Sequence, residues 1–389
     1  MKEFKLGVID GGLERKSGGA YYFLHGILKS AGNLRILIEV LGASRDLRQS
    51  NYSSNVTLLP TNKSIRLLDK LTKRIRALPF IGRSLGASRL VAMAEILLAS
   101  RGNQISPKNI KWWLYPHCFS VVPKLGHTTA VCYDLQHYAY PEYFPWFVRC
   151  MRNEAEISLS HIDKILCVSK FTQRELLTRY PKLENNTVVI YGGADIEADP
   201  REIERESNEI DKHFKRPFFL YPAVDWPHKN HALLFSVARI LKQETGSEFQ
   251  IVLTGERRRG SWLINQIKSR GLSEMLLDLG AVPRARLIAF YRRARALLFP
   301  SLYEGFGIPL IEAMALGTPI IASRCGAIPE ITGNVGIFFD PNSPDECLEA
   351  MKKVLVDSKL YGALSAAGYE RSKIFSWDNW WSTFLSNIE

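Results

Sequence analysis

Hydrophobic residues recur along this chain in two alternating patterns. Short apolar runs bounded by Gly, Pro or Asp are typical of buried strands, and the segments between them carry apolar residues every three or four positions, as amphipathic helices do. The predicted strands span residues 4–9, 35–41, 112–116, 129–133, 164–169, 187–191, 217–222, 249–254, 276–279, 294–299, 318–322 and 335–339. The predicted helices span residues 20–29, 62–77, 145–161, 170–180, 230–244, 261–270 and 283–293. This alternation predicts an α/β fold with parallel sheets covered on both faces.

The alternation is interrupted once, which predicts two domains. Residues 195–215 are charged and poor in large apolar groups, and we interpret them as the connection between the domains. A chain of 389 residues is long enough for two domains of roughly 150–200 residues, each with its own core. We therefore expect an N-terminal Rossmann-like domain over residues 1–195 and a C-terminal one over residues 196–371.

Composition indicates a globular protein of the cytoplasm. Hydrophobic residues make up 46% of the chain and charged residues 23%, and no apolar run approaches the roughly 18 residues of a membrane span. The N-terminus passes directly into a predicted strand, so we expect no signal peptide. The six cysteines follow no metal-binding spacing and are expected to be buried thiols in a reducing compartment. They are Cys118, Cys132, Cys150, Cys167, Cys325 and Cys347.

The net charge of +12 is unevenly distributed. Residues 63–89 contain eight Lys or Arg against the single Asp69. Such a surface favours anionic partners, and contact with an anionic membrane is one hypothesis. The alternative is a solvated helix face whose apolar side packs on the sheet. Nucleic acid is not expected as a partner, because no platform of basic and aromatic residues accompanies the charge.

Two glutamates near the C-terminus, Glu304 and Glu312, stand eight positions apart. A glycine-containing turn follows a predicted strand, and a helix is expected to begin at Pro309, whose missing N–H costs nothing at a first helical position. Gly317 fits the left-handed residue that ends a helix. The alternative for the pair is a helix-capping acid and a solvated surface glutamate.

The turn before this helix predicts a site for an anion such as a diphosphate. Backbone N–H groups at a helix start are unpaired and lie at the positive end of its dipole. Glu312, one turn inside the helix, can accept hydrogen bonds from vicinal hydroxyls, and Glu304 can face a sugar. The residues expected to present N–H groups are Gly305, Phe306, Gly307 and Ile308.

The run EGFGIPLIEAMALGTPIIAS from Glu304, continued by Gly326-Ala-Ile-Pro-Glu330, resembles the signature of retaining GT-B glycosyltransferases of family 4. The resemblance implies a GT-B fold, in which two Rossmann-like domains face each other across a cleft, with the nucleotide mainly on the C-terminal domain. It implies a terminal helix, here 372–389, that crosses back onto the N-terminal domain. It also implies that Glu304 contacts the transferred sugar and Glu312 the ribose. The N–H groups of Phe306, Gly307 and Ile308 would surround sugar and phosphate.

A lysine just before a predicted helix is the second candidate. Lys229 at that place favours a phosphate nearby, although it can also be a surface lysine of no consequence. The resemblance implies a diphosphate clamp in which an arginine six residues earlier assists this lysine. The chain has Ala223 at that position, and His228 or an arginine of 257–259 is a possible substitute.

The N-terminal half offers two weaker candidates. Gly18-Gly19 precedes a predicted helix, where a backbone can approach a phosphate or sugar, although such pairs are often only tight turns. Asp134 and His137 follow a predicted strand. Many relatives have His where this chain has Tyr133, so Asp134 or His137 is expected to supply the polar contact to the donor sugar. The alternative is that Asp134 only caps the next helix.

No metal or cofactor is expected. The chain has no Asp-x-Asp and no His pair at i, i+4, so Lys, Arg and helix ends would neutralise the leaving diphosphate.

The resemblance implies retaining sugar transfer from a nucleotide-sugar donor to a glycan or lipid-linked acceptor. We expect a cytoplasmic location, and contact with the inner face of the cytoplasmic membrane is the hypothesis that rests on residues 63–89. Tyr133-Asp-Leu-Gln-His137 and Trp226-Pro-His-Lys-Asn230 resemble mannosyl- and rhamnosyltransferases of bacterial surface polysaccharides, which favours GDP-mannose. A dTDP-rhamnose or UDP-sugar donor, a non-catalytic sugar-nucleotide-binding subunit and an epimerase are the alternatives.

Overall fold

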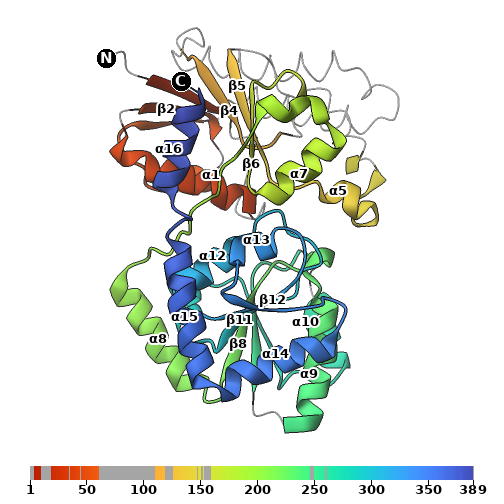
Figure 1. Cartoon of the computed structure of the whole chain (residues 1–389). Coiled ribbons are helices and arrows are strands. Elements are labelled where there is room, and N and C mark those ends of the chain that lie inside the picture. Colours follow the sequence, from red (N-terminus) through yellow and green to blue (C-terminus); the bar gives the residue numbers. More distant parts are fainter. Residues whose placement is uncertain are drawn as a thin grey trace. The chain divides into compact units, whose positions relative to one another are not determined.

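A computed structural model gives the structure (Figure 1). It describes residues 4–9, 19–34, 36–43, 45–60, 110–118, 126–146, 148–149, 152, 159–245, 249–258, 260 and 262–388. The chain divides into two compact units. Unit 1 comprises Met1–Gly192 with Trp377–Glu389, and unit 2 comprises Gly193–Ser376. Gly18, the basic segment 63–89, the predicted helix 62–77 and most of the predicted helix 145–161 lie outside the described residues.

The described strands of unit 1 form one parallel, seven-stranded sheet in the order β3-β2-β1-β4-β5-β6-β7. They are β1 (Phe4–Ile9), β2 (Ile36–Ala43), β3 (Val56–Pro60), β4 (Trp112–Tyr115), β5 (His127–Cys132), β6 (Lys164–Cys167) and β7 (Thr187–Val189). The helices are α1 (Gly19–Ser30), η2 (Ala31–Asn33), α2 (Arg45–Arg48), α5 (Gln136–Ala139), η4 (Pro141–Tyr143), α7 (Lys170–Arg179), η5 (Pro181–Asn186) and α16 (Trp377–Ile388). Strand β3 was not predicted from the sequence. Because the strands are parallel, the loops that follow them meet at one sheet edge.

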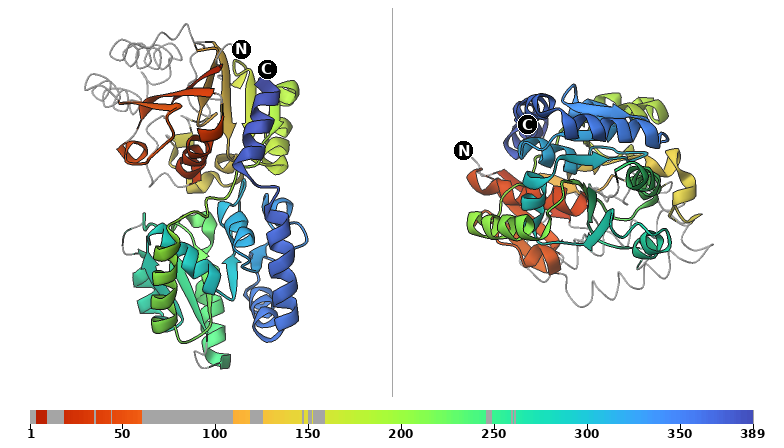
Figure 2. Two further views of the ribbon diagram at one scale, coloured as in Figure 1. Left: turned by 90° about the vertical axis from the view of Figure 1, so that its left-hand side faces the viewer. Right: turned by 90° about the horizontal axis from the view of Figure 1, so that it is seen from below.

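The C-terminal helix α16 packs against α1 in unit 1, which confirms the expected return of the chain onto the N-terminal domain (Figures 1 and 2). The Trp381 indole N–H donates to the Ser30 hydroxyl over 3.1 Å. Trp380, Trp381 and Phe384 are buried and pack ring against ring. A side chain at Gly26 would bring its Cβ within 2.1 Å of the Trp377 ring, so α1 has a glycine where α16 crosses it.

The described strands of unit 2 form a parallel, six-stranded sheet in the order β10-β9-β8-β11-β12-β13. They are β8 (Phe218–Pro222), β9 (Gln250–Thr254), β10 (Leu276–Gly280), β11 (Ala296–Phe299), β12 (Ile320–Ser323) and β13 (Gly336–Phe339). The helices are α8 (Pro200–His213), η6 (Pro227–Lys229), α9 (His231–Thr245), α10 (Trp262–Ser269), α11 (Arg284–Arg293), α12 (Ile308–Ala315), α13 (Ile328–Thr332), α14 (Pro344–Val356) and α15 (Ser358–Ser372). Helices α14 and α15 were not predicted from the sequence.

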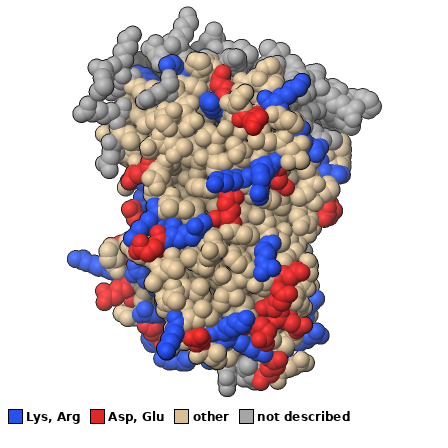
Figure 3. Space-filling view, viewed as in Figure 1, with Lys and Arg blue, Asp and Glu red and all other residues tan. Residues whose placement is uncertain are grey.

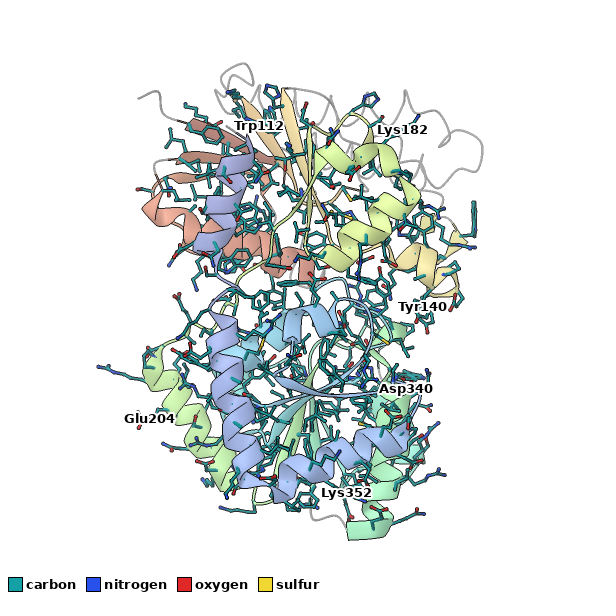
Figure 4. The ribbon with its side chains drawn as sticks, viewed as in Figure 1. Trp112, Tyr140, Lys182, Glu204, Asp340 and Lys352 are labelled. Atoms are coloured by element: carbon teal, nitrogen blue, oxygen red, sulfur yellow. The ribbon has the colours of Figure 1, made fainter. Side chains whose placement is uncertain are left out.

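The interpretation of residues 195–215 as a connection is wrong, because most of that segment is helix α8 of unit 2. Asp199 caps the helix by accepting the Arg201 N–H over 2.9 Å. Ile203, Ser207 and Ile210 are buried one helical turn apart, and the helix packs on α11. Charged residues cover its outer face, where Glu204 is exposed (Figure 4). Three small or aliphatic residues in a charged segment were too weak a signal for a helix.

Two expectations from composition, on membrane-spanning segments and on the cysteines, can be compared with the structure. No helix in the described part of the chain is long and apolar enough to cross a bilayer. The five described cysteines are free thiols, and all except Cys325 are buried.

Acidic and basic side chains are interspersed over the face of unit 2 seen in Figure 3.

We predict that Gly26→Ala destabilises the protein by about 1–3 kcal/mol, because the Trp377 ring must move out of the new methyl group's place. Denaturant unfolding of both variants and the wild type measures this. Gly362→Ala is the matched control, since a Cβ at that helical glycine meets nothing within 4 Å and should be neutral or stabilising. Equal stability of the two variants would contradict the proposed packing.

Candidate functional site

Unit 2 brings Lys229 and Glu304 together in a buried ion pair. Lys229 ends η6, which follows β8, and Glu304 lies in the loop that follows β11. The Lys229 Nζ lies 2.6 Å from Glu304 Oε1, and the two side chains are only 17% and 10% exposed. Removing two charges from water costs several kcal/mol per ion, so such a pair persists only with close geometry. Two predicted site residues, 75 positions apart, are therefore direct partners.

Backbone and amide contacts fix the lysine. Asn230 adopts a left-handed conformation with φ of 58°, and its amide donates to the carbonyls of Pro300 at 3.1 Å and Pro341 at 2.9 Å. The Tyr221 hydroxyl donates to the Lys229 carbonyl. The Leu302 N–H donates to the His228 carbonyl over 2.7 Å. The loops after β8, β11 and β13 are thus joined around Lys229.

The backbone of Glu304 is positioned by contacts with Gly326 and Ala327. The Ala327 N–H donates to the Glu304 carbonyl over 2.9 Å. Gly326 has φ of +57°, and a Cβ there would lie 2.5 Å from the Glu304 carbonyl oxygen. Only glycine avoids both the backbone strain and this clash. The Gly326 of the signature therefore has a structural role in placing Glu304.

Helix α12 begins where the sequence predicts an anion site. It starts at Ile308, one residue before Pro309, and Gly317 ends the segment with φ of +69°, as predicted. Gly307 has φ of +105°, and a Cβ there would lie 2.7 Å from Leu310 Cδ1. Among the described residues, the N–H groups of Gly307 and Ile308 have no acceptor. Phe306 is buried, with its ring 6.0 Å from that of Phe375.

Glu312 is buried and contacts two residues that the sequence did not single out. Its Oε1 lies 2.8 Å from Arg284 Nη2, and its Oε2 accepts the Tyr291 hydroxyl over 2.8 Å. Burial raises the pKa of the Glu312 carboxyl, and Arg284 and Tyr291 oppose that rise. Arg284 and Tyr291 stand seven positions apart on α11, which puts them on one helix face. That spacing was the signal available in the sequence.

Arg257 lies beside Ala223, where the family resemblance leads one to expect an arginine. Its Nη1 donates to the Ala223 carbonyl over 3.2 Å, and its Nε contacts Asp278 Oδ1 at 2.8 Å and Oδ2 at 3.0 Å. Gly255 packs so closely that a Cβ there would lie 2.7 Å from the Ala223 oxygen.

His228 is the other candidate substitute for that arginine. Burial, followed by the Lys229 charge, lowers the pKa of His228.

The carboxyl ends of β4 and β5 bring a second polar group together in unit 1. Arg152 Nη1 lies 3.0 Å from His137 Nδ1 and 3.5 Å from Asp134 Oδ1. Asp134 also accepts the Gln136 N–H over 3.0 Å, so it stabilises the local turn as well. Burial lowers the pKa of His137 to about 3, with a further contribution from Arg152, so the imidazole is neutral at physiological pH.

His117 belongs to this group and was missed in the sequence. It follows β4, and its ring lies 5.7 Å from that of Tyr133, which follows β5. Burial lowers its pKa to about 4. Since β4 and β5 are neighbours in the sheet, a histidine after one and an aspartate after the other were a detectable signal.

The remaining candidates are less informative. Gly19 is the first residue of α1, and a Cβ there would meet nothing within 4 Å. Across the described residues there is no cluster of three or more His, Cys, Asp or Glu side chains suited to a metal ion.

Comparison with known proteins identifies the family of this chain. Residues 201–371 match the family described as glycosyl transferases group 1. The chain is 30% identical over 317 residues to O-antigen chain mannosyltransferase B of Escherichia coli, covering 80% of this chain and 82% of that protein. It is 28% identical over 233 residues to O-antigen chain mannosyltransferase RfbU of Salmonella typhimurium, covering 60% and 62%.

Solved structures confirm the fold. The structure of Anabaena HepE in complex with UDP and glucose has a TM-score of 0.68 at 17% identity, with 99% of both chains covered. The structure of WaaG, a glycosyltransferase involved in lipopolysaccharide biosynthesis, has a TM-score of 0.66 at 12% identity, with 95% of both covered. The two parallel sheets and these neighbours define a GT-B fold, as expected. The chain belongs to the family of glycosyl transferases group 1, whose members are retaining, nucleotide-sugar-dependent enzymes.

We predict that Gly326→Ala displaces Glu304 and lowers sugar transfer at least about tenfold, because the new methyl group collides with the Glu304 backbone. Turnover of the nucleotide sugar and the melting temperature are the measurements. Gly271→Ala is the matched control, with a similar φ of +64° but nothing within 4 Å of its Cβ. Equal activity of both variants would show that backbone strain alone, and not the Glu304 contact, explains Gly326.

Proposed function

We propose that this protein transfers mannose from GDP-mannose, with retention, to a glycan or lipid-linked acceptor in bacterial surface polysaccharide synthesis. The observation that carries the proposal is the Lys229–Glu304 pair beside the start of α12. In this arrangement the Lys229 cation and the N–H groups at the start of α12 would bind a diphosphate, and the Glu304 carboxylate would bind sugar hydroxyls. The mannosyltransferase relatives support the choice of donor. We assign the nucleotide sugar to the C-terminal domain, residues 196–371, and the acceptor to the N-terminal one, 1–195 with 372–389.

In this proposal the diphosphate replaces part of the contact between Lys229 and Glu304. Lys229 and the N–H groups of Phe306, Gly307 and Ile308 stabilise the charge that develops on the departing diphosphate. Glu304 then binds hydroxyls of the transferred sugar, and Glu312 binds the ribose. Asp134 and His137 orient the sugar and the acceptor, and Gly18-Gly19 lets the backbone approach the substrates.

Retention follows if reaction occurs on one face of the sugar. The bond from the anomeric carbon to the phosphate oxygen breaks, and the acceptor oxygen forms its bond on the same side. The leaving phosphate oxygen accepts the acceptor's proton, so the protein need not supply a base. Its contribution is orientation and charge stabilisation, and no metal is required.

A second candidate is a subunit that binds the sugar nucleotide without turning it over. Ala223 and Tyr133, which depart from the family pattern, favour it. Incubation with GDP-mannose, UDP-glucose or dTDP-rhamnose and a mannosyl acceptor separates the two functions. Transfer supports the enzyme, and binding without consumption supports the subunit.

We predict that Lys229→Ala lowers kcat/KM by about 10²–10⁴-fold, because one of the charges that stabilise the leaving group is removed. Steady-state transfer assays measure this, and circular dichroism checks the fold. Because Glu304 would be left buried without a partner, the double variant Lys229→Ala/Glu304→Gln separates lost stability from lost chemistry. Lys352→Ala, at an exposed ion pair, is the control. Near-normal turnover of the Lys229 variant would refute the assignment.

We predict that Glu312 recognises the ribose hydroxyls. GDP should therefore bind the wild type about 10-fold more tightly than 2′,3′-dideoxy-GDP, because a buried carboxylate is left without its hydroxyl partners. Glu312→Gln should bind the two nucleotides nearly equally. Calorimetry gives all four dissociation constants. An unchanged preference in the variant would remove Glu312 from the ribose site.

A further inference from the structure

The segment from Tyr138 to Trp146 in unit 1 carries five aromatic side chains. Tyr138 and Phe144 are covered by cations, with the Arg179 guanidinium 3.4 Å and the Arg152 guanidinium 4.8 Å from the respective ring centroids. Of the other three, Tyr140 and Tyr143 are half-buried and Trp146 is exposed. We call Tyr140, Tyr143 and Trp146 the aromatic rim.

The rim offers flat apolar surfaces to solvent. The rings of Tyr140 and Tyr143 are stacked, with centroids 5.1 Å apart and an interplanar angle of 3°. Trp146 is 58% exposed. Tyr140 lies at the edge of unit 1, just beyond α5 (Figure 4). An exposed tryptophan that follows a stacked pair of half-buried tyrosines offers flat ring faces on which a ligand can lie.

The backbone of the rim is ordered by short turns. The Tyr143 N–H donates to the Tyr140 carbonyl over 3.1 Å, and the Phe144 N–H donates to the Pro141 carbonyl over 3.2 Å. Pro145 accepts the Arg149 N–H over 3.2 Å. Two prolines and these bonds restrict the segment before any ligand binds, which lowers the entropy lost on binding.

The rim continues directly from the candidate group around His137. Arg152, which covers the Phe144 ring, is the same residue that contacts His137 and Asp134. The His137 and Phe144 ring centroids lie 6.4 Å apart. The rim residues thus belong to the chain segment that directly follows Asp134 and His137.

Charge distinguishes the possible occupants of this surface. Residues 138–146 include one acidic residue, Glu142, and no lysine or arginine. The two arginines that contact the segment are already engaged, since Arg179 covers the Tyr138 ring and Arg152 contacts His137. Residues 138–146 themselves therefore offer no basic side chain to an anionic membrane or a nucleic acid. A neutral sugar ring fits, because its C–H face complements the negative face of an aromatic ring while its hydroxyls reach the tyrosine hydroxyls and Glu142.

We propose that Tyr140, Tyr143 and Trp146 form an acceptor subsite that binds neutral sugar residues preceding the one that accepts the transferred sugar. The inference rests on the proposed function and narrows the acceptor to an oligosaccharide or polysaccharide chain. The rim would discriminate acceptors by length, because a single sugar at Asp134 and His137 does not extend to it.

The experiment compares a long and a short probe, α-linked mannotetraose and methyl α-mannoside. Replacing all three rim residues with alanine should raise the KM for mannotetraose by about 10-fold or more, since each lost stacking contact weakens binding several-fold. The KM for methyl α-mannoside, the kcat and GDP binding should not change. Tyr369→Ala, at an exposed tyrosine of unit 2, is the matched control.

Direct binding of mannotetraose, measured by calorimetry without donor, makes the test independent of turnover. Binding by the wild type that the rim variant loses supports the subsite even if no donor is consumed, in which case only the proposed function fails. Equal use of both probes by the rim variant and the wild type overturns the subsite while the proposed function stands. Loss of both probes indicates a structural role and overturns it too. The rim variant is also tested for binding to phosphatidylcholine–phosphatidylglycerol vesicles. If it loses vesicle binding but keeps mannotetraose binding, the rim is a membrane surface and the subsite is overturned.

Discussion

The buried ion pair between Lys229 and Glu304 determines how the loops of unit 2 are organised. Each charge would be costly without its partner at such low exposure, so the ion pair favours one relative position of the two loops that carry it. Asn230 joins both loops to the segment after β13, and Gly326 fixes the Glu304 backbone. A site arranged in this way is preorganised for a negatively charged ligand, because the cation and the helix start are already in place.

The parallel sheets explain why polar residues far apart in the sequence become neighbours. In unit 2, the loops after β8 and β11 leave adjacent strands on the same edge, and Lys229 meets Glu304 there. In unit 1, the loops after β4 and β5 bring His117 near Tyr133. The same architecture thus produces the Lys229–Glu304 ion pair in unit 2 and a mixed group of charged and neutral polar residues in unit 1.

The departures from the family pattern have structural counterparts. At position 223 the chain has alanine, and the Arg257 guanidinium lies against its carbonyl with Asp278 holding it. At position 133 it has tyrosine, which packs against His117 and Phe23. A changed residue in each unit is therefore accompanied by a cation or a histidine from a neighbouring loop.

The sequence by itself determined the α/β class, most strands and, within one residue, the start of helix α12, because strand periodicity and glycine–proline signals are local properties. It also determined the resemblance through Glu304 and Glu312. It did not determine helix α8, whose apolar face is recognisable only against α11. Nor did it determine Arg284, Tyr291 and Arg152 as partners of the site residues. Those contacts join residues that are adjacent only because parallel strands and their helices place them at one sheet edge, and that proximity is a property of tertiary structure alone.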